Sequence, residues 1–166
     1  EGVGHLQDAK GTDVELVALQ EQGEDLRVVG LEVHVELATR TKLFSASPNR
    51  FGDEPNTNID PVTLGLPGAL PVLNKHAVEL AIRLGLALNC TVQPSTFHRK
   101  NYFYPDLPQG YQISQLYHPI VGEGEVLVEL GDGLARTVRI ERIHLEQDAG
   151  KSIHDMDPNM SFVDLN

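Results

Sequence analysis

A strict alternation of apolar and polar residues between Arg27 and Leu37 constrains the fold of this chain more than any other feature. The segment reads RVVGLEVHVEL, and every second residue from Val29 onward is Val or Leu. Side chains two apart point to the same face of a β-strand, and valine favours strands over helices. The pattern therefore predicts a strand with one apolar face and one polar face. The polar face carries Glu32, His34 and Glu36.

The length and composition indicate one globular domain with a hydrophobic core. The chain has 166 residues, of which 40% are hydrophobic, and it lacks the apolar run that a membrane span requires. Its single cysteine, Cys90, cannot form an internal disulfide, which fits a reducing, cytoplasmic location. The chain starts at Glu1, and strand-like residues reach Asn166. We therefore expect both ends to be cuts through a longer natural chain.

The charge is strongly negative and unevenly distributed. The net charge is −11, and residues 1–26 contribute −6 of it because they hold seven acidic residues and one lysine. Phosphate contacts need a basic surface, so RNA binding would require a local basic patch or a basic partner. The same 26 residues are rich in Gly, Gln, Asp and Glu. We expect them to form a flexible leader, with room for one helical turn, before a domain that spans residues 27–166.

Periodicity and capping residues predict further regular elements. Residues 75–89 form the best helix, with Asn74 as its N-cap and an apolar stripe wide enough to predict burial on most sides. Residues 125–130 and 135–146 read as two strands joined by a tight Gly-Asp-Gly turn. The alternation in the second of these strands changes phase near Glu141–Arg142, which predicts a β-bulge.

Two proline- and glycine-rich segments, residues 38–73 and 97–121, interrupt these elements and read as long loops. The second contains interleaved aromatic and basic residues, which are typical of a binding loop. Taken with the strands and the helix, the sequence predicts an α+β fold with a mixed, mostly antiparallel sheet and a buried helix.

Two polar strand faces are candidates for a catalytic or metal site. One is the face of Glu32 and His34, and the other carries His144, Glu146 and Asp148, with Gln147 between the two acids. Imidazole and carboxylate donors suit Mg²⁺ or Mn²⁺. Either face alone is explained more simply as an exposed polar strand edge. Two such faces in one sheet favour a functional site.

A third candidate group lies in the second loop and comprises Arg99, Lys100 and Asn101 with the aromatic residues Tyr102, Phe103 and Tyr104. The lysine is suited to hold a phosphate or an activated carboxylate, and the aromatic rings to stack on a base. The alternative is that Tyr102 and Phe103 are core residues. The sequence contains no spaced Cys/His set for zinc, no Walker-type lysine loop and no G-x-S-x-G turn, so it does not support those mechanisms.

Eight motifs in order along the chain match one known family. They are VVGLEVHVEL at 28–37, TKLFS at 41–45, EPNTN at 54–58, LGLPGALPVLNK at 64–75, GLALNC at 85–90, RKNYFYPDLPQGYQISQ at 99–115, RIHLEQDAGKSIH at 142–154 and VDLN at 163–166. In sequence and spacing they resemble the B-subunit family of the aspartyl/glutamyl-tRNA(Asn/Gln) amidotransferases. The resemblance implies a cradle-shaped catalytic domain, incomplete here at its C-terminal end and followed in the family by domains that grip tRNA.

The resemblance also implies an ATP-dependent carbon–nitrogen ligase. In the family an amidase-type A subunit releases ammonia from glutamine, and a small C subunit completes a heterotrimer. The B subunit uses ATP and Mg²⁺ to phosphorylate the side-chain carboxylate of Glu-tRNA(Gln) or Asp-tRNA(Asn), and ammonia then forms the amide. Two alternatives remain open: a scaffold that docks the A subunit without chemistry, and the related archaeal subunit that pairs with an asparaginase-like partner.

The family pattern assigns roles to individual residues. Its catalytic residues would be Glu32, His34, Lys100, Glu146 and Asp148. Its metal ligands would be Glu32, His34, Glu146 and Gln147, while Arg99, Lys100 and Tyr102 would bind ATP. Glu36 would keep a structural or supporting role.

Several positions depart from the family pattern. Many members hold a structural zinc ion with four cysteines, whose positions are occupied here by Ser45, Ser47, Asp60 and Thr63. No zinc is therefore expected, and we expect packing and prolines to hold this loop. Gln147 replaces a frequent glutamate and cannot act as a base, and His98 replaces a common aspartate, which alters a local salt bridge. A further metal-binding acid of the family follows the VDLN motif, so we expect the 166 residues to be inactive alone.

Overall fold

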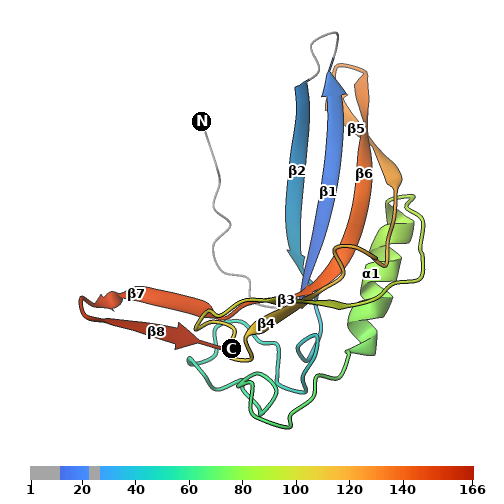
Figure 1. Ribbon diagram of the computed structural model, residues 1–166. Coiled ribbons are helices and arrows are strands. Elements are labelled where there is room, and N and C mark those ends of the chain that lie inside the picture. The colour runs from blue at the N-terminus through green and yellow to red at the C-terminus, as the bar shows by residue number, and fades with distance from the viewer. Residues whose placement is uncertain (1–11, 23–26) are drawn as a thin grey trace.

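The fold consists of a long, twisted sheet that rises from a base of loops, with one helix beside its lower part and a separate hairpin projecting from the base (Figure 1). This computed structural model describes the backbone of residues 12–22 and 27–166 and the side chains of residues 30–166. Among the described residues, no helix has the length and apolar character needed to cross a membrane.

The described strands form two sheets. The strands are β1 (Thr12–Gln22), β2 (Arg27–Glu36), β3 (His98–Asn101), β4 (Tyr111–Ser114), β5 (Gly124–Gly131), β6 (Leu134–Gln147), β7 (Lys151–Asp157) and β8 (Met160–Asp164). The larger sheet has the order β2-β1-β6-β4-β3, with β5 also paired to β6, and β7 and β8 form the second sheet. Every pairing among these strands is antiparallel. The predicted α+β fold with a mostly antiparallel sheet is confirmed in this respect.

Strand β1 is the main departure from the sequence prediction. The expected flexible leader is wrong for Thr12–Gln22, which pair with β2 on one side and with β6 on the other. Residues 1–11 and 23–26 lie outside the described residues. A local pattern misses β1 because half of its backbone partners come from β6, near the other end of the sequence, and strand formation depends on such tertiary context.

Helix α1 (Lys75–Ala87) packs one face against the lower part of the sheet (Figure 1). The Asn74 side chain accepts a hydrogen bond from the His76 backbone N–H (3.0 Å), which confirms the predicted N-cap. Its fully buried positions are Ala77, Ala81 and Gly85, which recur every four residues and so share one face. The predicted burial on most sides is wrong, because these small residues bring one face close to the sheet and leave the opposite face in solvent.

The hydrophobic core lies where α1 meets the lower half of β6. Ile143 and Leu145 of β6 are completely buried, and Val121, in the connection that precedes β5, packs with them. Val121 also forms two backbone hydrogen bonds with Ile143 (3.0 and 3.2 Å). This arrangement covers the apolar face of β6 and directs its intervening polar residues to the other face of the sheet.

The predicted turn and bulge are both present. Gly131, Asp132 and Gly133 have φ angles of 92°, 50° and 74°, the left-handed values of a tight hairpin turn. In the β1–β6 pairing, Val17 faces Arg142 and Ala18 faces Ile140, so Glu141 is the extra residue of a bulge. The bulge shifts the alternation of β6, and the residues after it carry the polar face described below.

The predicted loop over residues 97–121 contains regular structure. It includes the antiparallel hairpin of β3 and β4, in which Lys100 is opposite Gln112. These strands are four residues long. Such short strands give too few alternations for periodicity to detect.

Side-chain hydrogen bonds hold the first long loop together. The Asp60 carboxylate accepts from the Thr63 backbone N–H (2.8 Å), and the Thr63 hydroxyl accepts from the Asp60 backbone N–H (2.7 Å). Burial acts to raise the pKa of Asp60, but hydrogen bonds from Thr63, Ser45 and Ser47 lower it overall. Packing and prolines are therefore only part of what holds this loop, because its four polar positions are joined by hydrogen bonds.

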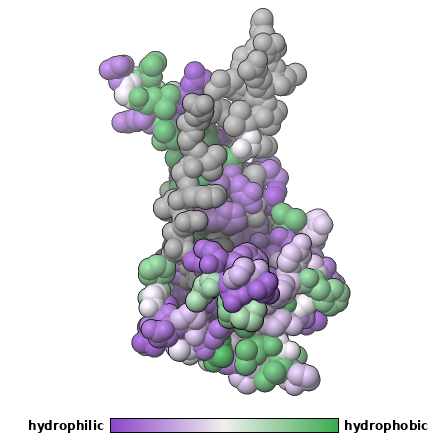
Figure 2. Space-filling model, turned by 90° about the vertical axis from the view of Figure 1, so that its left-hand side faces the viewer, coloured by the Kyte–Doolittle hydropathy of each residue, from purple (hydrophilic) through white to green (hydrophobic). Residues whose placement is uncertain are grey.

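The same loop exposes apolar side chains at the base of the molecule. Figure 2 shows hydrophobic residues gathered at the lower end, where the loop of residues 38–73 lies in Figure 1. Phe51, Leu70 and Val72 are each more than 70% exposed. The middle of this view is more hydrophilic, in keeping with a polar site above the loop.

Candidate active site

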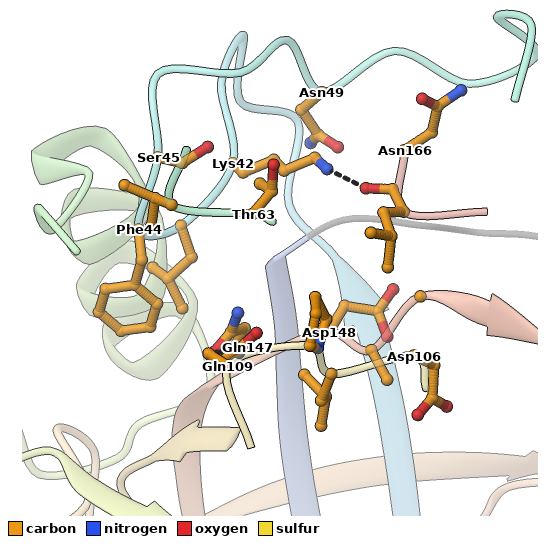
Figure 3. A pocket seen from close by; sticks show the side chains of 17 residues that line it. Lys42, Phe44, Ser45, Asn49, Thr63, Asp106, Gln109, Gln147, Asp148 and Asn166 are labelled. Carbon is orange, nitrogen blue, oxygen red and sulfur yellow. Dashed lines mark hydrogen bonds between the residues drawn. The ribbon is translucent and has the colours of Figure 1, made fainter. Parts of the chain in front are cut away.

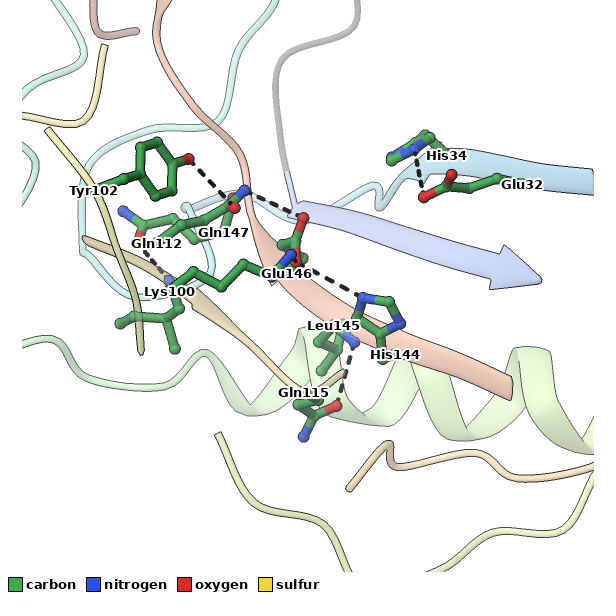
Figure 4. Close-up of polar contacts among 11 residues, drawn as sticks. Glu32, His34, Lys100, Tyr102, Gln112, Gln115, His144, Leu145, Glu146 and Gln147 are labelled. Carbon is green, nitrogen blue, oxygen red and sulfur yellow. Dashed lines mark hydrogen bonds and ion pairs between the residues drawn. The ribbon is translucent and has the colours of Figure 1, made fainter. Parts of the chain in front are cut away.

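A half-buried carboxylate at the end of β6 is the centre of the candidate site (Figure 4). The Lys100 ammonium lies 2.6 Å from Glu146 Oε2, and Gln112 Nε2 donates to Glu146 Oε1 over 3.2 Å. His144 Nε2 lies 3.7 Å from the same Oε2 atom. The Glu146 side chain is only 13% exposed, so these groups replace most of its solvent contacts.

These contacts determine the protonation state of Glu146. Burial acts to raise the pKa of Glu146, but polar contacts with His144, Lys100 and Ser114, together with the positive charge of Lys100, lower it to about 2. Glu146 is therefore ionised at neutral pH. It fixes the ammonium of Lys100, whose side chain remains 39% exposed and so keeps a solvent-facing side.

Sheet register explains why residues far apart in sequence meet at this point. Ser114 of β4 is directly opposite Glu146, so β4 runs beside the end of β6. Lys100 of β3 is opposite Gln112, which brings the lysine to the same face. Sequence analysis missed Gln112 and Ser114 as site residues, although both lie within the RKNYFYPDLPQGYQISQ motif.

Two polar side chains near Glu146 are completely or almost completely buried: His144 of β6 and Gln115, which directly follows β4. His144 is 0% exposed and precedes Glu146 by two residues, so both point to one face of β6. On the other side, the Gln115 amide oxygen accepts from the Leu145 backbone N–H (3.2 Å), while its Nε2 donates to the Ser95 hydroxyl (3.0 Å). Gln115 thus fixes the position of β6 relative to the preceding loop, and it too escaped the sequence analysis.

The structure separates the three residues predicted to bind ATP. The Tyr102 hydroxyl donates to Gln112 Oε1 (3.4 Å) and lies on the side of Lys100. Burial raises the pKa of Tyr102, as do the negative charges of Asp106 and Glu146. Arg99, one residue from Lys100 on β3, points to the opposite face and stacks on the Tyr111 ring, with its guanidinium 4.4 Å from the ring centroid.

The predicted residues of β2 form a separate half of the site. Glu32 Oε1 and His34 Nε2 lie 3.6 Å apart, and both side chains are more than half exposed. Strand β1 lies between β2 and β6, as Figure 4 shows. In the two pairings, Glu36 and Glu146 are both opposite Asp13, so these two residues share a face and lie two strand spacings apart, roughly 10 Å. His34 and Glu32 lie two and four residues further along β2 and are therefore farther from Glu146.

Asp148 and Gln147 face a different cavity (Figure 3). This cavity of about 60 Å³ is also lined by Lys42, Asp106 and Gln109. The Gln147 amide oxygen accepts from Gln109 Nε2 (3.2 Å) and from the Ile113 backbone N–H (3.4 Å), so protein groups already occupy it.

The negative charge of Asp148 acts on Glu36 of β2. Burial raises the pKa of Glu36, and the charge of Asp148 raises it further. Glu36 of β2 therefore interacts electrostatically with Asp148, which follows the end of β6. From the sequence we expected only a supporting role for Glu36. Its position on the same strand face as Glu32 and His34 was the signal that could have placed it in the site.

The four predicted metal ligands do not converge on one point. Among the residues with described side chains, no three His, Cys, Asp or Glu residues gather into a metal site. Glu32 and His34 nevertheless offer an exposed carboxylate and an exposed imidazole. Magnesium is commonly held by one or two carboxylates, with water and phosphate oxygens in its other positions. Glu32 supplies a ligand of this preferred type, whereas the His34 imidazole is a less usual magnesium ligand.

Two motifs near opposite ends of the chain interlock above the cavity. The Asn56 side chain donates to the Val163 carbonyl and accepts from the Leu165 backbone N–H (both 2.9 Å). The Asn166 side chain accepts from the Asn58 backbone N–H (2.8 Å). The Lys42 ammonium reaches the Leu165 carbonyl at 2.5 Å (Figure 3). The EPNTN and VDLN motifs thus form one structural unit.

Comparison with known proteins agrees with the motifs. Residues 27–166 match the family described as the GatB/GatE catalytic domain. Relatives named as the B subunit of an aspartyl/glutamyl-tRNA(Asn/Gln) amidotransferase are 71% identical over 140 residues in Jannaschia sp. (strain CCS1) and in Dinoroseobacter shibae, and 69% identical in Ruegeria pomeroyi. Each match covers 84% of this chain and 28% of the relative's length. The chain belongs to the GatB/GatE catalytic-domain family.

Proposed function

We propose that this domain is the part of a cytoplasmic tRNA amidotransferase that activates a carboxylate with ATP. The substrate would be the side-chain carboxylate of a misacylated Glu-tRNA(Gln) or Asp-tRNA(Asn), held in a cradle-shaped domain. A carboxylate oxygen would attack the γ-phosphorus of ATP, with ADP as the leaving group. Ammonia would then attack the carbonyl carbon and displace phosphate to form Gln-tRNA(Gln) or Asn-tRNA(Asn), and its surplus proton would pass to a neighbouring base.

The Lys100–Glu146 ion pair is the observation that most supports this proposal. Phosphoryl transfer places extra negative charge on the transferred oxygens, and a fixed cation stabilises that charge without reorganising. Glu146 holds the ammonium of Lys100 at 2.6 Å while leaving one side of it accessible. Tyr102 lies on the same side and would flank the nucleotide.

The exposed pair on β2 would hold the metal ion. Glu32 and His34 would bind Mg²⁺, which supplies charge neutralisation for the phosphates when it is bound. Asp148 and Glu36 raise the negative potential beside this pair, which favours a cation over a free anion there. Glu146 and Gln147 would act by positioning neighbouring groups, since protein donors already occupy their oxygens.

The proposed partners are an amidase-type A subunit, which supplies the ammonia, and a small C subunit in a heterotrimer. The three relatives are each named as one subunit of an amidotransferase, which supports an assembly of several chains. Because the chain spans 28% of their length, we place tRNA binding in other parts of the full subunit and expect these 166 residues to be inactive alone.

Equilibrium binding of Mg²⁺–ATP tests the proposal. We expect His34→Ala to weaken binding at least tenfold, since it removes one of two metal ligands. His76→Ala, on the exposed start of α1, is the matched control and should bind as the wild type does. If no variant binds ATP while docking to the A subunit is intact, the domain is a docking scaffold and the proposal fails.

An amidation assay tests the expected inactivity. The 166-residue chain would be combined with the A and C subunits, ATP, glutamine and Glu-tRNA(Gln). We expect no measurable Gln-tRNA(Gln), with a full-length relative of this chain as the positive control. Turnover near that of the full-length protein would contradict the expectation.

A further inference from the structure

Arg99 is a motif residue that the proposed active site does not use. The alternation of β3 directs Lys100 to Glu146 and Arg99 to the opposite face of the β3–β4 hairpin. Arg99 is exposed and stacks on Tyr111, and no carboxylate pairs with it among the residues whose side chains are described. An unneutralised guanidinium is notable in a chain of net charge −11.

Arg99 also lines an apolar pocket of about 230 Å³, beside the Tyr111 ring on which its guanidinium stacks. Its apolar lining comprises Phe44, Pro71, Leu73, Phe97 and Ile113. The Phe44 and Phe97 rings meet edge to face, with centroids 5.1 Å apart and planes at 82°. Such a pair is a stable aromatic arrangement, so it gives the pocket a defined floor.

Backbone hydrogen bonds fix the wall of the pocket. The Val72 N–H donates to the Phe44 carbonyl (3.0 Å), and the Asn74 N–H donates to the Leu43 carbonyl (2.7 Å). These bonds hold the segment with Pro71 and Leu73 against residues 43–44 of the same loop. His98, which also borders the pocket, is engaged by ring contacts with Tyr117 and His118, so Arg99 is the pocket's principal charged group.

The size and lining of the pocket restrict its occupant. Pockets for drug-sized ligands are typically about 300–1,000 Å³, so this one suits a single large side chain. An apolar side chain gains free energy by leaving water for such a lining. The planar guanidinium beside it matches a carboxylate in two-pronged hydrogen bonding. A nucleic acid would find a partner for one phosphate but none for its sugars in this lining.

The geometry points to a peptide-docking site for a partner protein. The occupant is the C-terminal end of a partner chain, which presents an apolar side chain next to its terminal carboxylate. The side chain sits against Phe44 and Phe97, and the carboxylate lies on Arg99. This assignment is independent of the amidotransferase chemistry, because no residue of the pocket belongs to the Lys100–Glu146 cluster.

A matched pair of peptides tests the site. The probes are N-acetyl-Gly-Gly-Phe with a free C-terminal carboxylate and the same peptide as its C-terminal amide. They would be titrated into the ¹⁵N-labelled 166-residue chain and followed by amide chemical shifts. We expect the acid to bind with a dissociation constant on the order of 1 mM, with shifts at the amides of residues 72–73 and 97–99, and the amide peptide to bind about tenfold more weakly.

Variants separate the two parts of the interaction. Arg99→Gln should weaken the acid to the level of the amide and leave amide binding unchanged. Arg136→Gln, an exposed arginine on β6, should change neither. Leu73→Glu should weaken both peptides, because it places a charge in the apolar wall.

Three results would overturn the site. Equal binding of the acid and the amide would show that Arg99 does not bind the carboxylate. Equal binding of N-acetyl-Gly-Gly-Gly would show an anion site with no apolar specificity. Tighter binding of a short oligoribonucleotide than of the acid peptide, lost in Arg99→Gln, would make this face a nucleic-acid contact instead.

Discussion

Neighbouring residues of β3 face two different surfaces of the molecule. Lys100 points to the buried carboxylate of Glu146, and Arg99 points to an apolar pocket on the other face. In the sequence the two form one basic pair, and both read equally well as phosphate ligands. The distinction depends on recognising His98–Asn101 as a strand, which four residues do not reveal without their partner β4.

The low pKa of Glu146 predicts a specific dependence of stability on pH. Its folded-state pKa of about 2 lies below the ordinary value of 4.5, so the ionised carboxylate stabilises the folded state fully above pH 4.5. This contribution, on the order of 3 kcal/mol, is lost as pH falls from 4.5 toward 2. Glu146→Gln should therefore be less stable than the wild type at pH 7, and this difference should shrink by about half at pH 3.

Urea unfolding at a series of pH values measures this effect. Glu129→Gln is the control, because Glu129 is exposed on β5 and should leave the pH profile unchanged. If Glu146→Gln keeps the wild-type loss of stability between pH 4.5 and pH 3, the stabilising role of the ionised carboxylate is refuted.

Elements with a strong local signal agree with their predictions, whereas those that depend on partners do not. Alternation located β2, and capping and apolar spacing located α1. The phase change near Glu141 located the bulge of β6 before any partner strand was known. Strand β1 was not predicted, because half of its backbone hydrogen-bond partners lie on β6, far away in the sequence. Periodicity also overestimated the burial of α1, since it reports which residues are apolar and not how much surface the rest of the chain covers.

The packing of α1 predicts an unusual response to a helix-favouring substitution. A Cβ atom on Gly85 would lie 2.7 and 2.9 Å from the two methyl carbons of Val121, a residue with no exposed surface. Alanine gains about 1 kcal/mol over glycine in helix propensity, but overpacking costs about 1–3 kcal/mol. We expect Gly85→Ala to lower the free energy of unfolding.

Chemical denaturation checks this expectation. The double variant Gly85→Ala/Val121→Ala should lose less stability than the sum of the two single losses, because Val121→Ala removes the methyl groups that clash. Leu86→Ala on the exposed face is the helix control and should have little effect. Greater stability of Gly85→Ala than of the wild type would show that α1 has room to move away from the sheet.

At the scale of the whole molecule, two motifs from opposite parts of the chain meet and position the final residues. Asn56, with a left-handed φ of 58°, exchanges side-chain hydrogen bonds with the backbone of Val163 and Leu165. The sequence shows each motif but not their contact, because neither motif contains a local pattern that identifies its partner. Their interlocking explains physically why both contain asparagine, whose amide donates and accepts at once.

Replacing Asn56 tests whether this contact orders the end of the chain. Asn56→Gly keeps the left-handed backbone accessible and removes only the side-chain hydrogen bonds. We expect amide hydrogen exchange at Leu165 to become about tenfold faster, the loss of roughly one hydrogen bond. Asn159→Gly, in the exposed turn between β7 and β8, is the control for a change of the same kind. Unchanged exchange at Leu165 in Asn56→Gly would mean that other contacts hold this segment.

The position of β1 between β2 and β6 also sets an order of assembly. Strands β1 and β2 are adjacent in sequence, as are β5 and β6, so each hairpin closes a short loop. Joining β1 to β6 closes a loop that spans most of the chain, which is the slower event. We expect two preformed hairpins to dock late in folding. Glu32 and His34 on one hairpin and Glu146 on the other would then come into register only when nearly the whole domain has been synthesised.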